Sequence, residues 1–324
     1  MSGLQKTRPV ISAIDQDTWR SSKYDMAVFA LGFESRSICF VEDVAKSTDR
    51  PIAYGFDHGH DKAYKSNVDR FADAGVSVQD SLSDEGFELA LKTSLGLVAD
   101  DTCRKIFVDI SCFTRFRLAA IVHEIFEAAT SRTNDLVIDF AYALAKFERP
   151  SSESRPNTIV GPAHRAFAGW SQGGYFSTAA VLGLGYEQDQ AMGVVEYLQA
   201  GEVWAFTPNS PVPEYKPAVR KANDLLLSEL APNHVIEYDV CSPASVIATL
   251  ESVVRGLGDE HSVVLVPFGP KVFVLCCLIV AAIRQDVAVW RVSQGSRIEP
   301  HDRVPSDVRI GVRLTFPGAN LRAE

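Results

Sequence analysis

Two short segments of the chain combine glycine, a carboxylate and neighbouring polar or aromatic side chains in a way that suits a ligand site. After the apolar run 26–31, the first segment holds Gly32, Phe33, Glu34, Arg36 and Ser37. After the apolar run 179–184, the second segment holds Gly185, Tyr186 and Glu187. A carboxylate in this place can contact a ligand hydroxyl or base amino group, or it can stabilise the start of a helix. The sequence leaves both roles open.

A second pair of segments carries a cation where an apolar, helix-like stretch begins. The first half of the chain has Ser111, Thr114 and Arg115, and the second half has Phe268, Gly269 and Lys271. Loops rich in Ser, Thr and Gly that open a helix leave backbone N–H groups free, and with a nearby cation they suit a phosphate or another anion. The alternative is that both cations are solvated first-turn charges. Their recurrence at matching places favours anion binding.

These motifs recur at a nearly constant spacing along the chain. The offset between Gly32 and Gly185 is 185 − 32 = 153 residues, and Tyr64-Lys65 recurs as Tyr215-Lys216 at an offset of 215 − 64 = 151. Solenoid repeats have periods of roughly 20–50 residues, so a period this long indicates a duplicated domain. We therefore predict a first domain over residues 1–148, a linker rich in Pro, Ser and Gly over 149–177, and a second domain with a C-terminal extension over 178–324.

Short apolar runs alternate with helix-like stretches in both halves, which predicts α/β domains with parallel sheets and a Rossmann-like fold. The strands expected in the first half are 27–31, 52–56, 76–79, 106–110 and 136–144, and those in the second half are 181–184, 203–206, 235–239, 263–266 and 287–292. In such sheets ligands bind where the strand order reverses, beyond the carboxyl ends of the strands. We expect the duplicated domains to form a pseudo-dimer with the site between them.

Composition narrows the function classes. The 324-residue chain has a net charge of −9 and a sequence pI near 5.3, so nothing in the overall balance attracts nucleic acid or an anionic membrane. The first twenty residues lack the apolar region of a signal peptide, and the six cysteines contain no C-x-x-C pair. We therefore expect a cytoplasmic protein with reduced thiols.

Support for a cofactor or a metal is weak in the sequence. Gly183-Leu184-Gly185 lacks the third glycine of a dinucleotide fingerprint, so a nicotinamide cofactor is not indicated. The segment Asp57-His58-Gly59-His60-Asp61 has residue types that bind metals, but the second half has no equivalent. We expect neither a cofactor nor a metal site, and we read residues 57–61 as a polar loop.

The segments 109–115 and 267–271 resemble the strand-four loop of the CRISPR-associated Rossmann (CARF) family and its two-copy relatives, the SAVED sensors. In that family a Thr/Gly-rich loop that ends in Lys or Arg contacts cyclic nucleotides across a two-fold interface. The resemblance implies nucleotide sensing in a prokaryotic defence system. The first copy lacks the paired glycines, and the sequence shows no nuclease, protease or membrane effector, so an effector would act in trans.

Three functions remain open from the sequence. The first is a protein that binds a nucleotide or phosphorylated ligand and signals to a protein partner. The second is an enzyme that acts on such a substrate, with Glu34 or Asp109 in acid-base roles and Arg115 or Lys271 holding phosphate. The third is an assembly subunit with a vestigial pocket. The first is our prediction, because no nucleophile-base pair is visible near either glycine.

Overall fold

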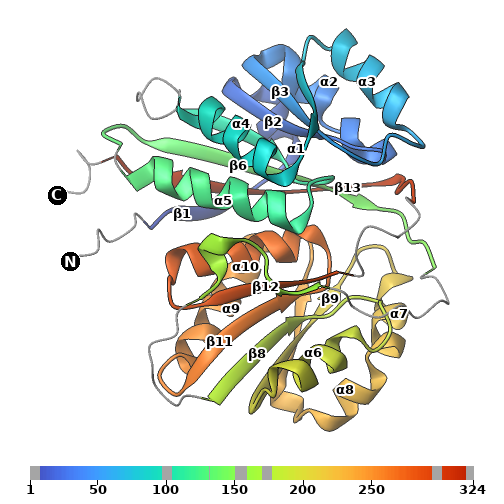
Figure 1. Cartoon of the computed structure of the whole chain (residues 1–324), viewed down its shortest axis with the longest axis vertical. Coiled ribbons are helices and arrows are strands. Elements are labelled where there is room, and N and C mark those ends of the chain that lie inside the picture. The colour runs from blue at the N-terminus through green and yellow to red at the C-terminus, as the bar shows by residue number, and fades with distance from the viewer. Residues whose placement is uncertain are drawn as a thin grey trace. The chain divides into compact units, whose positions relative to one another are not determined.

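The computed structural model describes residues 8–96, 104–130, 132–149, 159–169, 177–293 and 301–318. The chain divides into two compact units. Unit 1 comprises Met1–Lys146 and Glu299–Glu324, and unit 2 comprises Phe147–Ile298. Each unit has an α/β fold with one mostly parallel sheet (Figure 1), which confirms the predicted fold class.

The sheet of unit 1 has the order β1-β13-β6-β5-β2-β3-β4. Strands β4, β3, β2, β5 and β6 are parallel, whereas β13 is antiparallel to both β6 and β1. The strands are β1 (Val10–Ile14), β2 (Tyr24–Leu31), β3 (Thr48–Phe56), β4 (Ser77–Leu82), β5 (Lys105–Asp109), β6 (Leu136–Ala145) and β13 (Pro305–Phe316). The helical segments are α1 (Gln16–Ser21), η1 (Ser35–Ile38), α2 (Val41–Val44), η2 (Ala45–Ser47), α3 (Tyr64–Asp73), α4 (Asp84–Gly96) and α5 (Arg115–Thr130).

The sheet of unit 2 has the order β10-β9-β8-β11-β12-β7, with only β7 antiparallel. Its strands are β7 (Ile159–Pro162), β8 (Ser177–Gly183), β9 (Glu202–Asn209), β10 (Val235–Asp239), β11 (His261–Pro267) and β12 (Ala288–Ser293). Its helical segments are η3 (Arg165–Phe167), α6 (Gln190–Leu198), α7 (Tyr215–Ala222), α8 (Asp224–Glu229), η4 (Pro232–His234), α9 (Pro243–Leu257) and α10 (Lys271–Ile283).

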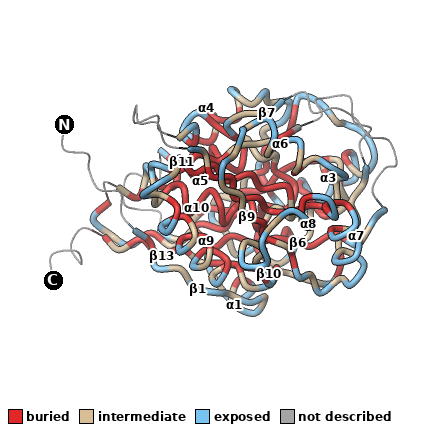
Figure 2. The backbone as a smooth tube through the Cα atoms, turned by 90° about the horizontal axis from the view of Figure 1, so that it is seen from below, coloured by how far each residue is buried: buried red, intermediate tan, exposed pale blue. Residues whose placement is uncertain are grey.

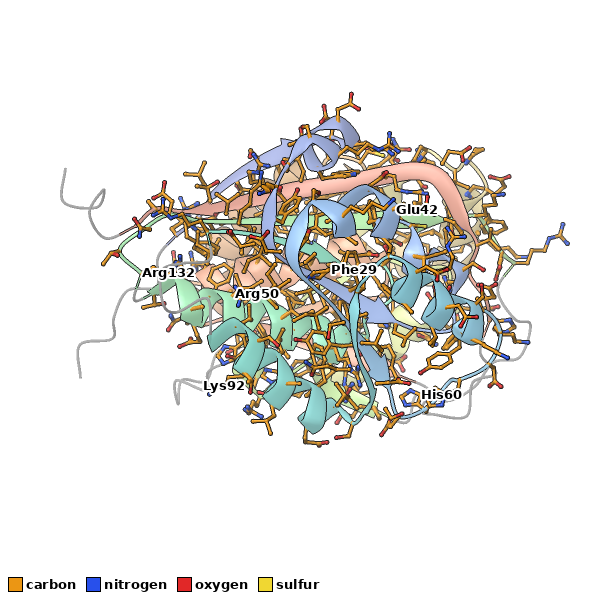
Figure 3. The ribbon with its side chains drawn as sticks, turned by 90° about the horizontal axis from the view of Figure 1, so that it is seen from above. Phe29, Glu42, Arg50, His60, Lys92 and Arg132 are labelled. Atoms are coloured by element: carbon orange, nitrogen blue, oxygen red, sulfur yellow. The ribbon has the colours of Figure 1, made fainter. Side chains whose placement is uncertain are left out.

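Both units place their five parallel strands in the same order. Numbered along the chain within each unit, the order is 3-2-1-4-5, and an antiparallel strand follows the fifth. An internal duplication predicts this match. The side chains of β2 alternate between the two faces of its sheet, so Ala27, Phe29 and Leu31 join the core beneath α2 and α3. Phe29 lies within this core in Figure 3, and the central strands and α10 are the most buried elements in Figure 2.

The C-terminal strand corrects the predicted domain boundary. We expected residues 178–324 to form one domain, but β13 lies between β6 and β1 in unit 1. Its Arg313 donates from Nε and Nη2 to the fully buried carboxylate of Asp139 on β6, at 2.6 and 2.8 Å. A buried carboxylate needs such donors, and Arg313 supplies them from 174 residues away in sequence. Apolar residues alternate along 308–316, which predicts a strand but does not say which strands it pairs with.

Three local expectations also change. The expected linker contains β7 and η3, which belong to unit 2, because β7 pairs with β12 from Ile159 to Pro162. The sequence pattern of residues 37–46 predicts one helix, but the structure has the short segments η1, α2 and η2 there. The pattern of residues 215–230 also predicts one helix, but the structure has α7 and α8, with Asn223 as the cap residue between them. Short helices of this kind depend on tertiary contacts, which periodicity does not report.

Candidate functional site

The strand order reverses between β2 and β5 in unit 1 and between β8 and β11 in unit 2. A crevice for a ligand is expected at this switch point, beyond the carboxyl ends of the strands. The predicted residues 32–37 follow β2, and 111–115 follow β5. Residues 185–187 follow β8, and 268–271 follow β11. The fold therefore brings the predicted residues of each unit to one switch point.

The two predicted glycines occupy equivalent places. Nδ2 of Asn67 on α3 donates to the carbonyl oxygen of Gly32 at 2.8 Å, and Nδ2 of Asn223 donates to the carbonyl oxygen of Gly185 at 2.8 Å. Both amides are buried. We did not predict these asparagines, although their offset of 223 − 67 = 156 residues matches the duplication. A buried carbonyl needs a donor, and the same donor serves both units.

In unit 1 an arginine fills the switch point. Arg36 is only 3% exposed, and its Nε donates to Oε2 of Glu34. Its Nη1 donates to the hydroxyl of Tyr142 at 3.4 Å and to the carbonyl oxygen of Ala143 at 3.3 Å, both on β6. The sheet order is β6-β5-β2, so a side chain that starts beyond β2 and ends on β6 must cross the carboxyl end of β5.

The charge of Arg36 is stabilised in place. Burial alone would lower the pKa of Arg36, but its electrostatic interactions with Tyr142 and Glu34 outweigh burial and hold the pKa well above its ordinary value. Glu34 stands at the N-cap of η1 but makes no capping hydrogen bond with its side chain. Its carboxylate is committed to Arg36, so the helix-capping role that we left open for Glu34 does not describe its contacts.

The predicted hydroxyls of unit 1 bond to the backbone. Ser37 Oγ donates to the carbonyl oxygen of Ala30, and Ser111 Oγ accepts from the N–H of Ala143 at 2.9 Å. Thr114 Oγ1 accepts from the N–H of Arg117 at 3.2 Å and so caps α5. These groups, which we expected to face an anion, therefore already hold the loops of unit 1 in place. Arg115 is the partly exposed first residue of α5.

Arg117, which the sequence analysis did not single out, joins the ends of two strands. Its Nη1 donates to the carbonyl oxygen of Gly55 at 2.8 Å, its Nη2 to that of Leu82 at 2.5 Å, and its Nε to Asp84 Oδ1 at 3.2 Å. The guanidinium is fully buried and lies 3.9 Å from the ring centroid of Phe56. The sequence did not single out Arg117 together with Arg115, because residues two positions apart lie on different faces of a helix.

In unit 2 the corresponding carboxylate, that of Glu187, differs in its contacts from Glu34. Oε2 of Glu187 is buried and has no hydrogen-bond donor in the part of the chain that the structure describes. It lies against Gly185, where a Cβ atom would collide with it and would lie 3.0 Å from the carbonyl oxygen of Phe268. Only glycine at position 185 leaves room for this arrangement. Glu187 as a whole is partly exposed.

The second loop of unit 2 differs from the loop we predicted. The N–H groups of Phe268 and Gly269 both donate to the carbonyl oxygen of Gly183, at 2.8 and 3.1 Å, so they are not available to an anion. Helix α10 begins at Lys271 behind Pro270, whose side chain cannot cap it. The first N–H groups of a helix have no intrahelical partner, and they carry the positive end of its dipole. Of the two helices at the predicted anion sites, α10 begins without a side-chain cap and α5 begins with one.

An aromatic cluster contains Tyr186, the residue directly before Glu187. The rings of Tyr186, Tyr215 and Phe147 have centroids 5.2 to 6.2 Å apart, and the two tyrosine rings are tilted by 33°. All three side chains are partly exposed. In unit 1 the matching residues are Phe33 and Tyr64. Tyr64 is more buried than Tyr215, stacks on His60 with 4.4 Å between centroids, and donates to Asp80.

The polar loop 57–61 has local contacts. His58 Nδ1 lies 2.7 Å from Asp57 Oδ1, and His60 Nε2 lies 2.8 Å from the carbonyl oxygen of Phe56. His60 lies in this loop in Figure 3. Among the described residues no group of three or more His, Cys, Asp or Glu side chains could hold a metal ion.

The described cysteines are free thiols. Three of them, Cys112, Cys276 and Cys277, are buried, Cys39 is partly exposed and Cys241 is exposed. Cys103 lies outside the described residues. Burial raises the pKa of Cys39 to about 11, so this thiol is protonated at neutral pH.

Comparisons with known proteins place the chain in no family. No protein-family model matches it, and no curated protein matches it. Solved structures with weak likeness include a candidate universal stress protein from Pseudomonas aeruginosa, at 10% identity and a TM-score of 0.24 over 85% of this chain and 95% of that one. The cytoplasmic domain of a prokaryotic cation chloride cotransporter gives 10% identity and a TM-score of 0.25 over 85% and 98%. At such scores neither likeness bears on function.

No helix among the described residues is long and apolar enough to cross a membrane.

Proposed function

We propose that unit 2 binds a nucleotide or a related phosphorylated ligand at the switch point between β8 and β11. The observation that carries the proposal is the buried Oε2 of Glu187, which lies at this switch point and accepts no hydrogen bond from any residue that the structure describes. A buried acceptor that lacks a partner costs about 1–3 kcal/mol, and more when it is charged. A ligand hydroxyl or amino group that donates to Glu187 would remove this cost. The protein without ligand would therefore favour a ligand that carries hydrogen-bond donors.

Two neighbouring features complete the recognition of a nucleotide. Tyr186, which directly precedes Glu187, and Tyr215 are partly exposed aromatic residues, and base–aromatic stacking contributes about 1–3 kcal/mol per base. Helix α10 begins at Lys271 without a side-chain cap, and a helix N-terminus with a cation favours a phosphate. A base, a sugar hydroxyl and a phosphate would each find matching chemistry in one unit.

The contrast with unit 1 supports placing the ligand in unit 2. There Glu34 is paired with Arg36, Thr114 caps α5, and the arginine covers the end of β5. A ligand in unit 1 would have to break a buried ion pair, and removal of one partner from such a pair costs about 3–5 kcal/mol. We propose that unit 1 stabilises the fold and does not bind the ligand in this way.

Binding is favoured over catalysis by the position of a serine–histidine pair. Ser177 Oγ and His261 Nδ1 are 2.6 Å apart, but these residues begin β8 and β11. They therefore lie at the amino ends of the strands, opposite to the switch point. Together with the resemblance to CARF and SAVED sensors, this supports a sensor that passes ligand binding to a protein partner in a defence system.

The test is calorimetry of the whole chain with 5′-mononucleotides, cyclic dinucleotides and ribose 5-phosphate. We expect Lys271→Ala to weaken binding of the tightest ligand by about tenfold to hundredfold, because it removes a charge-assisted contact of about 1.5–3 kcal/mol. Glu196→Gln, on the exposed face of α6, is the matched control and leaves the affinity unchanged. If none of these compounds binds at millimolar concentration, or if Lys271→Ala binds as the wild type does, the proposal is wrong.

A further inference from the structure

The contacts of Arg36 in unit 1 show which chemical group can bind to Glu34, the carboxylate that follows β2. The Arg36 guanidinium contacts four protein groups. It donates hydrogen bonds to the carboxylate of Glu34, the carbonyl oxygen of Ala143 and the hydroxyl of Tyr142, and its Cζ lies 5.7 Å from the centroid of the Tyr142 ring. A planar group with several N–H donors is thus bound at its edge by acceptors and contacted on its face by an aromatic ring.

Unit 2 has the acceptor and the aromatic rings, but no guanidinium of a described residue donates to Oε2 of Glu187. The residue that corresponds to Arg36 is Asp189, at the offset of 153, and it is exposed, with a left-handed backbone at φ 58°. Its carboxylate cannot donate to Glu187. The adjacent residue Tyr186 is partly exposed, and its ring packs near that of Tyr215, so an aromatic residue directly precedes the acceptor in the chain.

We infer that the ligand of unit 2 carries a guanine base, which supplies the guanidine group that this unit lacks. This inference rests on the proposed function and specifies its ligand. Guanine presents the donors N1–H and N2–H₂ side by side on a planar ring. A carboxylate has only acceptors, so both oxygens of Glu187 can be satisfied by this edge. The purine ring would stack on Tyr186.

The other bases match this acceptor less well. Adenine presents one amino group beside the acceptor N1, which would face a carboxylate oxygen and be repelled. Hypoxanthine keeps N1–H but lacks the N2 amino group, and uracil places its single N–H between two carbonyl oxygens. A site that hydrogen-bonds a ligand group discriminates strongly against analogues that lack it, because its own buried polar atoms are left without partners.

The experiment compares GMP, IMP and AMP by calorimetry on the full chain. We expect GMP to bind at least tenfold more tightly than IMP and AMP. In Glu187→Gln the affinity for GMP should fall by about tenfold to hundredfold, since hydrogen bonds to a charged group are worth about 1.5–3 kcal/mol, while the affinity for AMP changes by less than about threefold. Glu196→Gln serves as the control on the same unit.

The outcomes separate this inference from the proposed function. If AMP binds as tightly as GMP, or if Glu187→Gln leaves the ratio of the two affinities unchanged, the guanine inference is wrong although nucleotide binding stands. If none of the three nucleotides binds, the guanine inference is wrong, and the wider panel of the first experiment decides whether nucleotide binding stands. Glu187→Asp retains the charge with a shorter reach and should also lose the preference for GMP, and melting curves of both variants verify folding.

Discussion

Asn67 and Asn223 make the same hydrogen bond in the two units: each donates from Nδ2 to the carbonyl oxygen of the glycine that follows the first parallel strand, at 2.8 Å. Asn67 also donates to the carbonyl oxygen of Glu34 at 3.0 Å, so it binds two backbone carbonyl oxygens of the loop that carries Arg36. The position of each predicted loop therefore depends on a helix outside it.

Replacement of Asn67 or Asn223 by alanine should lower the free energy of unfolding by about 1–3 kcal/mol each. The reason is that a buried carbonyl oxygen loses its donor and cannot reach water. Urea unfolding followed by circular dichroism measures this loss. Asn209→Ala, at an exposed position at the end of β9, is the control and should change stability by less than about 0.5 kcal/mol. Equal effects at all three positions would contradict the prediction.

Arg313→Ala should cost about 3–5 kcal/mol of stability in unit 1. The substitution leaves the fully buried Asp139 carboxylate with the Tyr24 hydroxyl at 2.8 Å and a lysine Nζ at 4.0 Å, and a buried charge without its partner is strongly destabilising. Thermal or urea unfolding gives the measurement, with Arg104→Ala at an exposed site as the control. An unchanged unfolding midpoint would show that β13 does not depend on this ion pair.

Arg36→Met should destabilise the protein more than Glu34→Gln does. The methionine cannot donate to Glu34, Tyr142 or Ala143 and strands a buried carboxylate, whereas glutamine removes the charge and keeps an acceptor for the guanidinium. We expect a loss of about 3–5 kcal/mol for Arg36→Met and about half of that or less for Glu34→Gln. The order of the two urea midpoints decides the matter, and a reversed order would refute the assigned role of Arg36.

Stability should fall as the pH rises from about 9 to about 11, in part through Cys39. Its thiol has an ordinary pKa of 9.0 that burial raises to about 11 in the folded protein, so the unfolded chain loses this proton first. The contribution to stability is present below pH 9 and is lost through this window. Urea midpoints at pH 8 and pH 10.5 measure the fall, and Cys39→Ser should make it smaller. An equal fall in both proteins would exclude the thiol as its source.

Thiol reactivity should follow exposure among the described cysteines. At pH 8 iodoacetamide should modify the exposed Cys241 in the folded protein, while the buried Cys112, Cys276 and Cys277 react only after unfolding. Burial raises the pKa of Cys276 and Cys277 well above the ordinary value, and the thiolate is the reactive form. Peptide mass spectrometry assigns the modified residues. Rapid labelling of Cys276 in folded protein would show that α10 opens.

Local pattern was sufficient for part of the candidate site. The offset between Gly32 and Gly185 is visible in the sequence. The apolar runs before these glycines predicted parallel strands, because strands buried on both faces are continuous runs of apolar residues. The choice of Arg115 over Arg117 shows the limit. Both are cations near a helix start, and only the fold reveals that Arg117 is buried against the ends of β3 and β4.

By itself, the sequence determined the α/β class, the two-fold recurrence of elements and the segments that follow the strands, since these depend on short-range periodicity. Only the tertiary structure decided that β13 joins unit 1, that Arg36 closes the switch point of unit 1, and that Oε2 of Glu187 has no hydrogen-bond donor within the described part of the chain. Each of these depends on hydrogen bonds and ion pairs between residues distant in sequence. Such partners are chosen by burial, which requires each enclosed polar group to find a donor or acceptor.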